Sequence, residues 1–341
     1  MRKLSFYFIA ILLSTSVFFI SCRQENKAPK NATIKVEKVA VDEFEVLANY
    51  LETNGNFINS EFVPAMIGAK EVHENIDNAA YLLIDTRGSD LFAAGHIKNA
   101  VQIAASDLIT NFEGKIIPSK YEKIVLICKS GQSASYATGI MRSLGYDNVY
   151  AMKYGMSSWN KSFAKKYWLK NITNDFANKL EKTPNNKPAK AGHPSISTGK
   201  TTGKEILKER AQNALNTPYK SLLVKAPAVF ENPENYYVLN YWPEAKYNAG
   251  HIPGAIQYTP KKSLETKADL YTLPVDKEIV AYCYTGQHAA FVTGYLNMLG
   301  YDAKALAYGA NSFMHTEMKN REGKWHAFTK KKMYNYTVVK D

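Results

Sequence analysis

Two cysteines stand at equivalent points of two similar segments, CKSGQS from Cys128 and CYTGQH from Cys283. Each cysteine follows a short apolar run and precedes a glycine-containing turn that opens into helical sequence. Backbone N–H groups of such a turn and of the first helical turn point toward the sulfur, where they stabilise an anion and lower the thiol pKa. The pattern therefore indicates a thiolate that can attack sulfur and hold it as a persulfide. The alternative is that each cysteine is only a small buried apolar side chain.

A disulfide between these two cysteines is the other interpretation to weigh. The chain of 341 residues contains three cysteines in all, and an exported protein would favour pairing them. Both cysteines, however, end a predicted buried strand in separate units, and a disulfide needs Cα atoms within about 7 Å of each other. We therefore expect two independent thiols.

The cysteine segments belong to a longer internal repeat. At a constant offset, GHI at 95–97 recurs at 250–252, and LGYD at 144–147 recurs at 299–302. Self-similarity of this length indicates a duplicated domain rather than a solenoid.

Each repeat alternates apolar runs with helical sequence. The short apolar runs are typical of buried parallel strands, and the spacing of apolar residues from 133 to 144 predicts a helix. This alternation predicts an α/β sheet with helices on both faces, whose ligands bind at the carboxyl ends of the strands. The predicted strands are 81–85, 123–128, 147–152, 236–240 and 278–283.

The N-terminus carries a basic start and an uncharged apolar run that ends in FISC at Cys22. This is a secretory signal, and the run is short for a membrane-spanning helix. FISC resembles a bacterial lipobox, so we expect a lipidated Cys22 in the cell envelope, on the periplasmic side or in the outer membrane; a plain signal peptide or anchor is the alternative. The expected divisions are a signal at 1–21, a tether at 22–45, a first domain at 46–180, a linker at 181–203 and a second domain at 204–341.

The segments IDTR, GHIKNA, CKSGQS and YGMSSW, with their second-half counterparts, resemble tandem rhodanese domains. The resemblance implies two rhodanese-like domains, each a parallel five-stranded sheet with helices on both faces, and sulfurtransferase activity. It implies that Cys128 and Cys283 are persulfide-forming nucleophiles. The implied substrate-binding loops are Lys129, Ser130, Gly131, Gln132 and Ser133 in the first domain, and Tyr284, Thr285, Gly286, Gln287 and His288 in the second.

The chain departs from the family pattern at the last loop position, where active members commonly carry arginine. Ser133 and His288 stand there instead. The first domain keeps Lys129 and a supporting Asp85 and Arg87, so we expect it to handle thiosulfate better than the second. A histidine titrates near pH 6.5, so His288 is either a cation at low pH or a residue that only packs at the loop edge. The histidines of the two GHI turns are interpreted as structural.

The expected substrates are a small anionic sulfur donor, of thiosulfate or polysulfide type, and a thiol or cyanide-like acceptor. No cofactor, metal or nucleic-acid partner is expected, and the protein is expected to be a monomer. The net charge of +12 includes small lysine runs such as 330–332, interpreted as solvated faces that favour small anions or acidic lipid headgroups. A phosphatase with this fold would need a longer cysteine loop and an arginine that binds phosphate. The cysteine loops of this chain are short and lack that arginine, which disfavours a phosphatase. The remaining alternative is a non-catalytic envelope protein that carries sulfur or binds a partner.

Overall fold

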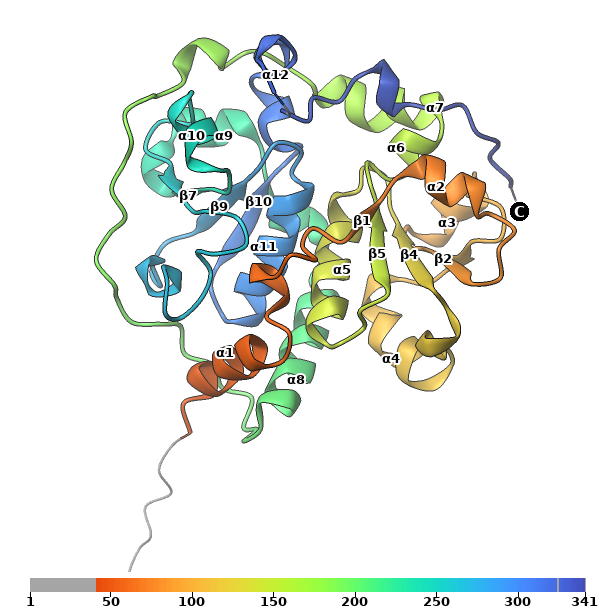
Figure 1. Ribbon diagram of the computed structural model, residues 1–341, viewed down its shortest axis with the longest axis horizontal. Coiled ribbons are helices and arrows are strands. Elements are labelled where there is room, and N and C mark those ends of the chain that lie inside the picture. Colours follow the sequence, from red (N-terminus) through yellow and green to blue (C-terminus); the bar gives the residue numbers. More distant parts are fainter. Residues whose placement is uncertain (1–40, 324, 341) are drawn as a thin grey trace, which may run out of the picture. The chain divides into compact units, whose positions relative to one another are not determined.

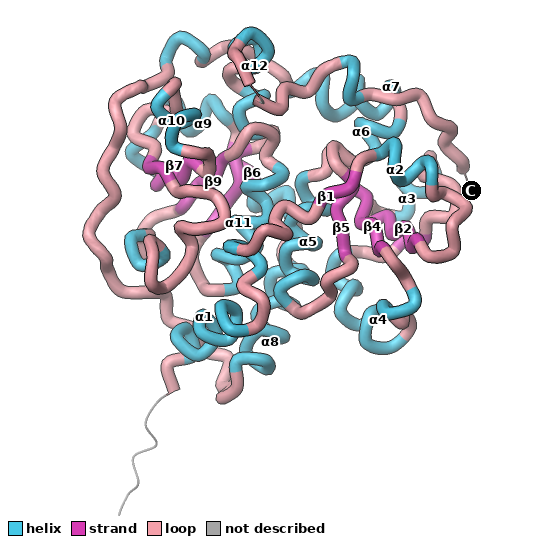
Figure 2. The backbone as a smooth tube through the Cα atoms, in the orientation of Figure 1, coloured by secondary structure: helices cyan, strands magenta, loops and turns pink. Residues whose placement is uncertain are grey.

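The first half of the chain forms a parallel five-stranded sheet. The computed structural model describes residues 41–323 and 325–340, and Figures 1 and 2 show how their elements are arranged. The strand order is β1-β5-β4-β2-β3, with parallel pairing throughout. The strands are β1 (Met66–Ile67), β2 (Tyr81–Asp85), β3 (Val101–Gln102), β4 (Lys123–Ile127) and β5 (Val149–Met152).

The second half repeats this sheet with the same topology. Its order is β6-β10-β9-β7-β8, again with parallel pairs. The strands are β6 (Leu223–Val224), β7 (Tyr237–Asn240), β8 (Ile256–Gln257), β9 (Ile279–Tyr282) and β10 (Ala303–Leu306). The predicted fold class, two α/β domains with five parallel strands each, is confirmed.

Helices cover the sheets and carry the connections between the parallel strands. In the first half they are α1 (Glu43–Thr53), α2 (Ala69–Glu74), α3 (Ser89–Ala93), α4 (Leu108–Gly114), α5 (Gln132–Ser143), α6 (Met156–Trp159) and α7 (Lys161–Phe163). In the second half they are α8 (Gly203–Asn216), α9 (Ala226–Glu231), α10 (Glu244–Asn248), α11 (Gln287–Met298) and α12 (His315–Asn320). None of the helices in the described ranges is long and apolar enough to cross a membrane.

The two halves contact each other through α5 and α11, the helices that follow the two cysteines. Gly139 of α5 and Gly294 of α11 hold equivalent positions in this interface. A Cβ at Gly139 would lie 3.1 Å from the ring of Phe291, and one at Gly294 would lie 3.4 Å from Ile140 Cγ1. The absence of side chains at both positions therefore lets the helices approach closely, so the contact between the halves is made by the elements that position the candidate site.

Each end of the described chain packs against the half of the protein to which it does not belong in sequence. Helix α1 packs beside α8 (Figure 1), and it begins at Glu43, inside the segment 22–45 that we expected to be a tether. The C-terminal residues, assigned to the second domain from the sequence, lie against the first. The Tyr334 N–H donates to Ser158 O at 2.9 Å, and the Val339 N–H donates to His96 O at 3.0 Å. The predicted linker contains no helix until α8 begins at Gly203.

Candidate active site

The first cysteine loop begins where the buried central strand β4 ends. Strand β4 pairs with β2 along its whole length, so Asp85 lies beside Ile127 and Cys128 follows at the carboxyl edge of the sheet. Gly131 caps α5 with φ of +85°, a left-handed conformation that glycine adopts without strain. The loop can therefore fold back over its own cysteine before the helix begins.

This loop presents its N–H groups to the sulfur. The N–H groups of Gly131 and Ala134 donate to Cys128 Sγ at 3.2 and 3.3 Å. The loop carbonyls are bound elsewhere: Met156 N–H donates to Cys128 O at 2.8 Å, and Trp168 Nε1–H donates to Ser130 O at 3.0 Å. With the carbonyl dipoles held by other groups, the sulfur lies in an N–H-lined nest of the kind that binds anions.

Cys128 lines a cavity of about 490 Å³. Among the predicted loop residues, Lys129, Ser130, Gln132 and Ser133 line it as well. Lys129 is exposed, and its ammonium lies 5.9 Å from the centre of the Tyr167 ring, which also lines the cavity.

Arg87 brings a buried positive charge to this cavity. Its side chain is fixed by Asp85, with Arg87 Nη2 2.6 Å from Asp85 Oδ2 and Nε 2.9 Å from Oδ1. Nη2 also donates to Gly95 O at 2.7 Å. Nη1 is buried and has no hydrogen-bond partner among the described residues. Arg87 is one of the residues that line the cavity, although the last loop position holds Ser133 rather than arginine.

Tyr219, which the sequence analysis missed, reaches the cavity from the second half of the chain. It precedes β6 and lines the cavity together with Cys128. Its hydroxyl is buried and has no partner among the described residues. Burial, reinforced by the nearby Cys128 thiol, raises the Tyr219 pKa well above its ordinary value, so the hydroxyl stays protonated and can donate. No short-range signal in the sequence marks this residue, because the contact joins the two halves.

The second cysteine loop forms the same kind of turn, with Gly286 in a left-handed conformation at φ of +71°. The Ala289 N–H donates to Cys283 Sγ at 3.3 Å. Burial nevertheless raises the pKa of the Cys283 thiol, because desolvation of the charged form outweighs the opposing N–H groups of Thr285, Ala289, His288 and Gly286. The predicted lowering of the thiol pKa is therefore wrong for Cys283.

Aromatic side chains surround the second cysteine where the first has cations. Trp242 stands at the position equivalent to Arg87, and Tyr284 at the position equivalent to Lys129. The two rings stack with centroids 5.1 Å apart, and Trp325 packs edge-on against Trp242 at 5.6 Å. The two sites are therefore chemically different: the first is basic, and the second is enclosed by aromatic rings.

His288 packs at the edge of the second loop and is neutral at ordinary pH. Its ring lies edge-on to Tyr241, with centroids 4.9 Å apart. The side chain keeps some exposed surface, but Nε2 is buried without a partner among the described residues. Burial, with a smaller contribution from the Lys261 charge, lowers the His288 pKa to about 3. Of the two interpretations of His288, the structure therefore favours a packing residue over a cation near neutral pH.

Two glutamines link the cysteine loops across the domain interface. The Tyr308 N–H of the second domain donates to Gln132 Oε1 at 2.7 Å. In the equivalent contact, the Tyr154 N–H of the first domain donates to Gln287 Oε1 at 2.7 Å. Both glutamines are buried. Each loop is therefore braced by the opposite domain.

Both cysteines are free thiols, which confirms the prediction that they do not pair. The histidines of the two GHI turns are held by backbone. Nδ1 of His96 lies 2.9 Å from Phe92 O, and Nδ1 of His251 lies 2.8 Å from Tyr247 O. In the described ranges, no group of three or more histidine, cysteine and acidic side chains could hold a metal ion. The predicted Cys22 anchor lies outside the described residues.

The raised pKa of Cys283 predicts slow alkylation that increases into the alkaline range. A thiol with a pKa above its ordinary 9.0 holds less thiolate at a given pH than a free cysteine. In a Cys128→Ser background, the iodoacetamide rate should still be rising above about pH 9. His288→Ala should leave the midpoint of that profile unchanged, because the imidazole is already neutral. A plateau near neutral pH would contradict this account.

The fold and the first site together define a class of protein: a duplicated parallel α/β domain that holds a cysteine in an N–H-lined loop at the end of a central strand. The sequence profile described as "Rhodanese-like domain" matches residues 68–162 and 233–316, more than half of the chain. The chain belongs to the rhodanese-like family and contains two such domains.

Relatives resemble the chain over parts of its length. A protein of Buchnera aphidicola subsp. Schizaphis graminum with no described function is 28% identical over 129 residues, 38% of this chain and 84% of its own. The tRNA uridine(34) hydroxylase of Erwinia tasmaniensis is 31% identical over 97 residues, 28% of each chain. The thiosulfate sulfurtransferase GlpE of Pseudoalteromonas translucida is 23% identical over 29% of this chain and 92% of its own.

Solved structures with similarity to the chain include a rhodanese-related protein of Thermoplasma volcanium. That structure is 29% identical and covers 28% of this chain and 88% of its own, with a TM-score of 0.25. SseA of Escherichia coli, described among 3-mercaptopyruvate sulfotransferases, is 18% identical over 71% of this chain and 97% of its own, with a TM-score of 0.26.

Proposed function

We propose that the protein is a sulfurtransferase that carries sulfane sulfur as a persulfide on Cys128. The observation that carries this proposal is the Cys128 sulfur, held by two backbone N–H groups in a cavity that Arg87 and Lys129 also line. Membership of the rhodanese-like family supports it. The donor is a small sulfur anion of thiosulfate or polysulfide type, and the acceptor is a thiol or a cyanide-like nucleophile.

The reaction consists of two displacements at sulfur. The Cys128 thiolate attacks the sulfane sulfur of thiosulfate, so a bond forms between the two sulfurs and the S–S bond of thiosulfate breaks. Sulfite leaves with the bonding electron pair. The acceptor thiolate or cyanide then attacks the outer sulfur of the persulfide, and the Cys128 thiolate is released. In each step the nucleophile supplies one electron pair and the leaving group takes one away. The two displacements therefore need no external oxidant or reductant.

The residues around the cavity have separate roles in this scheme. The loop N–H groups stabilise the thiolate and the persulfide anion. Arg87 Nη1, fixed by Asp85, neutralises the donor's charge, and Lys129 attracts anions from solvent. The Tyr219 hydroxyl donates to the bound donor. Because Tyr219 belongs to the second domain, the first site is complete only when both halves are present.

The surroundings of Cys283 in the second domain indicate a lower reactivity than we propose for Cys128. Cys283 has a raised pKa, and its surroundings are aromatic where the first site has Arg87 and Lys129. We therefore propose that Cys283 is the slower of the two thiols. The alternative for the whole protein, a non-catalytic sulfur carrier or partner-binding protein of the envelope, is supported chiefly by this domain.

Intact-mass measurement tests the proposal directly. The full chain is exposed to thiosulfate or polysulfide, and the mass of each cysteine-containing peptide is recorded. We expect one added sulfur atom on Cys128, which cyanide removes. An unchanged mass on both cysteines with both donors would overturn the enzymatic proposal in favour of the non-catalytic alternative.

Tyr219→Phe should slow sulfur loading of Cys128 without weakening the fold. A hydrogen bond to a charged ligand contributes about 1.5–3 kcal/mol, so the loading rate should fall roughly tenfold or more. Because the native hydroxyl has no protein partner among the described residues, its removal should leave the unfolding midpoint in urea unchanged or slightly higher. Stopped-flow measurement of sulfite release gives the rate.

Tyr154→Phe is the matched control for this variant. The Tyr154 hydroxyl is also buried without a partner among the described residues, but Tyr154 belongs to an aromatic cluster with Trp168 and Phe328. Removal of the Tyr154 hydroxyl should therefore leave sulfur loading of Cys128 unchanged. Equal rates in the two variants would exclude the proposed role of Tyr219.

We further propose that the protein is a lipid-anchored monomer of the bacterial envelope, attached through Cys22. The basic N-terminus and FISC support this proposal. Fractionation of a Cys22→Ser variant would test it, because unchanged membrane partition and processing would contradict the anchor.

A further inference from the structure

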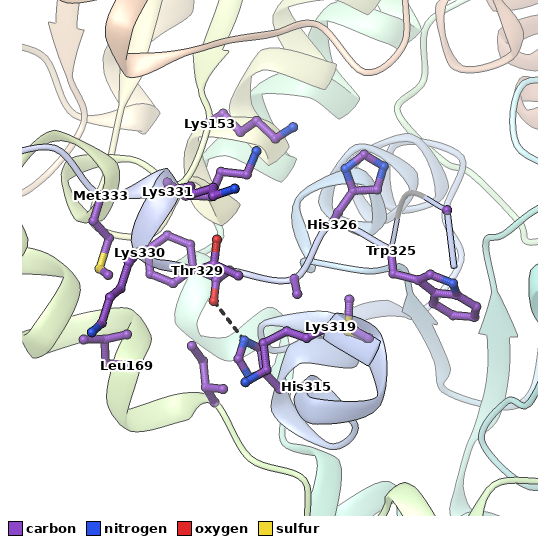
Figure 3. A pocket seen from close by; sticks show the side chains of 16 residues that line it. Lys153, Leu169, His315, Lys319, Trp325, His326, Thr329, Lys330, Lys331 and Met333 are labelled. Atoms are coloured by element: carbon purple, nitrogen blue, oxygen red, sulfur yellow. Dashed lines mark hydrogen bonds between the residues drawn. The ribbon is translucent and has the colours of Figure 1, made fainter. Parts of the chain in front are cut away.

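A second cavity, of about 1050 Å³, is lined by residues 325–333 together with α12 and residues that follow β5 and α7. Figure 3 shows its labelled side chains, including Lys153 after β5, Lys319 in α12, and Lys330 and Lys331 near the C-terminus. The dashed line joins His315 Nε2 to Phe328 O at 2.8 Å, a contact that ties α12 to the 325–333 segment. We call this cavity the lysine groove.

The lysine groove concentrates positive charge without compensating carboxylates. No acidic residue lines the groove, and no ion pair is formed by its lysines among the described residues. Burial, followed by the nearby Lys332 charge, lowers the pKa of Lys153. Mutual repulsion of this kind is relieved when an anionic ligand enters. The lysines of the groove are Lys153, Lys319, Lys330, Lys331 and Lys332.

Part of the lysine groove's lining is apolar. Trp325 and Phe328 line it but are only 3% and 1% exposed, so they contribute little accessible surface. Leu169, which is 43% exposed, and Met333 contribute apolar surface at one side. Cations beside exposed apolar surface fit a ligand that combines negative charges with apolar groups. A single sulfite or thiosulfate ion would fill only a small part of this volume.

The groove also adjoins the second cysteine loop. Tyr284, the residue after Cys283, lies 5.8 Å from Trp325 and 5.2 Å from His326 between ring centroids. Asn311 connects the two regions, because its Nδ2 donates to Tyr284 O at 2.6 Å and its Oδ1 accepts from Phe328 N–H at 2.8 Å. A ligand in the groove would therefore rest on the residues that enclose Cys283.

We propose that the lysine groove binds an acidic polypeptide segment with interspersed apolar side chains, supplied by a partner protein. Charge complementarity favours an anion, and the apolar surface of Leu169 and Met333 favours a chain with apolar side chains that can pack on it. The concave shape favours an inserted segment over a lipid surface, which would contact only the rim. This binding does not depend on sulfur transfer.

Fluorescence anisotropy with a labelled synthetic peptide of alternating glutamate and leucine tests the proposal. The full chain is compared with a Lys330→Gln, Lys331→Gln, Lys332→Gln variant. Because the variant loses three exposed ion pairs with the peptide, it should bind the peptide roughly tenfold or more weakly. A peptide of glutamine and leucine should bind neither protein, and added salt should weaken binding to the full chain.

A matched variant controls for the general loss of charge. Lys115, Lys120 and Lys277 are exposed lysines outside the groove, and their replacement by Gln removes the same charge. This control should bind the peptide like the unaltered chain. Equal weakening in both variants would overturn the proposal, because net charge alone would then account for binding.

Two further results would also decide the matter. In the first, vesicles containing phosphatidylglycerol replace the peptide. If the groove variant no longer binds these vesicles but still binds the peptide, the polypeptide proposal is overturned. If the groove variant has a lowered unfolding midpoint, Lys319→Gln with Lys331→Gln replaces it under the same criteria. Sulfur loading of Cys128 should be unchanged in either variant, so this proposal and the sulfurtransferase proposal can fail separately.

Discussion

Cys128→Ser should lower steady-state sulfur transfer from thiosulfate to cyanide by roughly a thousandfold, to the rate that Cys283 supports alone. Serine keeps the loop N–H contacts and the cavity, but its hydroxyl cannot form a persulfide. The residual turnover belongs to the second site, which lacks counterparts of Arg87 and Lys129, so the KM for thiosulfate should rise as well. Thiocyanate production measures the rate.

Cys283→Ser is the matched control, because it removes the equivalent sulfur from the enclosed loop. Its transfer rate should stay within a few-fold of the unaltered chain, as expected for a thiol with a raised pKa. A larger loss in Cys283→Ser than in Cys128→Ser would reverse the ranking of the two sites. Full transfer in the double variant would refute the persulfide mechanism.

Gly155→Ala should destabilise the protein by about 3 kcal/mol or more and abolish loading of Cys128. Gly155 has φ of +54° and ψ of −150°, a conformation that L-residues avoid. A Cβ there would overlap the Cys128 carbonyl oxygen and lie 2.8 Å from Gly131 N. Both atoms belong to backbone that shapes the cysteine loop, so the clash cannot be relieved by moving a side chain. Urea unfolding measures the change.

Gly145→Ala separates backbone strain from the clash. Gly145 also has a positive φ, of +93°, but a Cβ there would meet no atom within 4 Å. Its replacement should therefore cost only about 1–2 kcal/mol and leave Cys128 loading intact. If the two variants were equally stable, the crowding around Cys128 would have no energetic importance.

The repeat and the buried strands could be predicted because their signals are local. The apolar runs that end at Ile127 and Tyr282 have no polar face, so they report burial within the sheet wherever they occur in the chain. The cysteine turns are equally local, since Gly131 and the start of α5 are neighbours in sequence. These features indicated both nucleophile candidates and their turns, whereas the loop assignments and the supporting Asp85 and Arg87 came from the resemblance to rhodanese domains.

The rest of the site depends on contacts between residues far apart in the chain. Tyr219 reaches Cys128 from the other half, and nothing in its own neighbourhood indicates that its hydroxyl is unpaired. The state of Cys283 depends on a balance between desolvation and N–H donors, which residue types alone cannot rank. His288 was ambiguous for the same reason, because its charge depends on burial against Tyr241 rather than on its position in the loop.

The reciprocal glutamine contacts have the form of an isologous dimer interface. Gln132 meets Tyr308 as Gln287 meets Tyr154, so the two halves are related as identical subunits are by a two-fold axis. In a homodimer every substitution is expressed at both sites and must suit both. Fusion of the halves into one chain removes that constraint. Arg87 can be kept at one site while Trp242 occupies its counterpart, and an interface inherited from symmetry can hold two unlike cysteines.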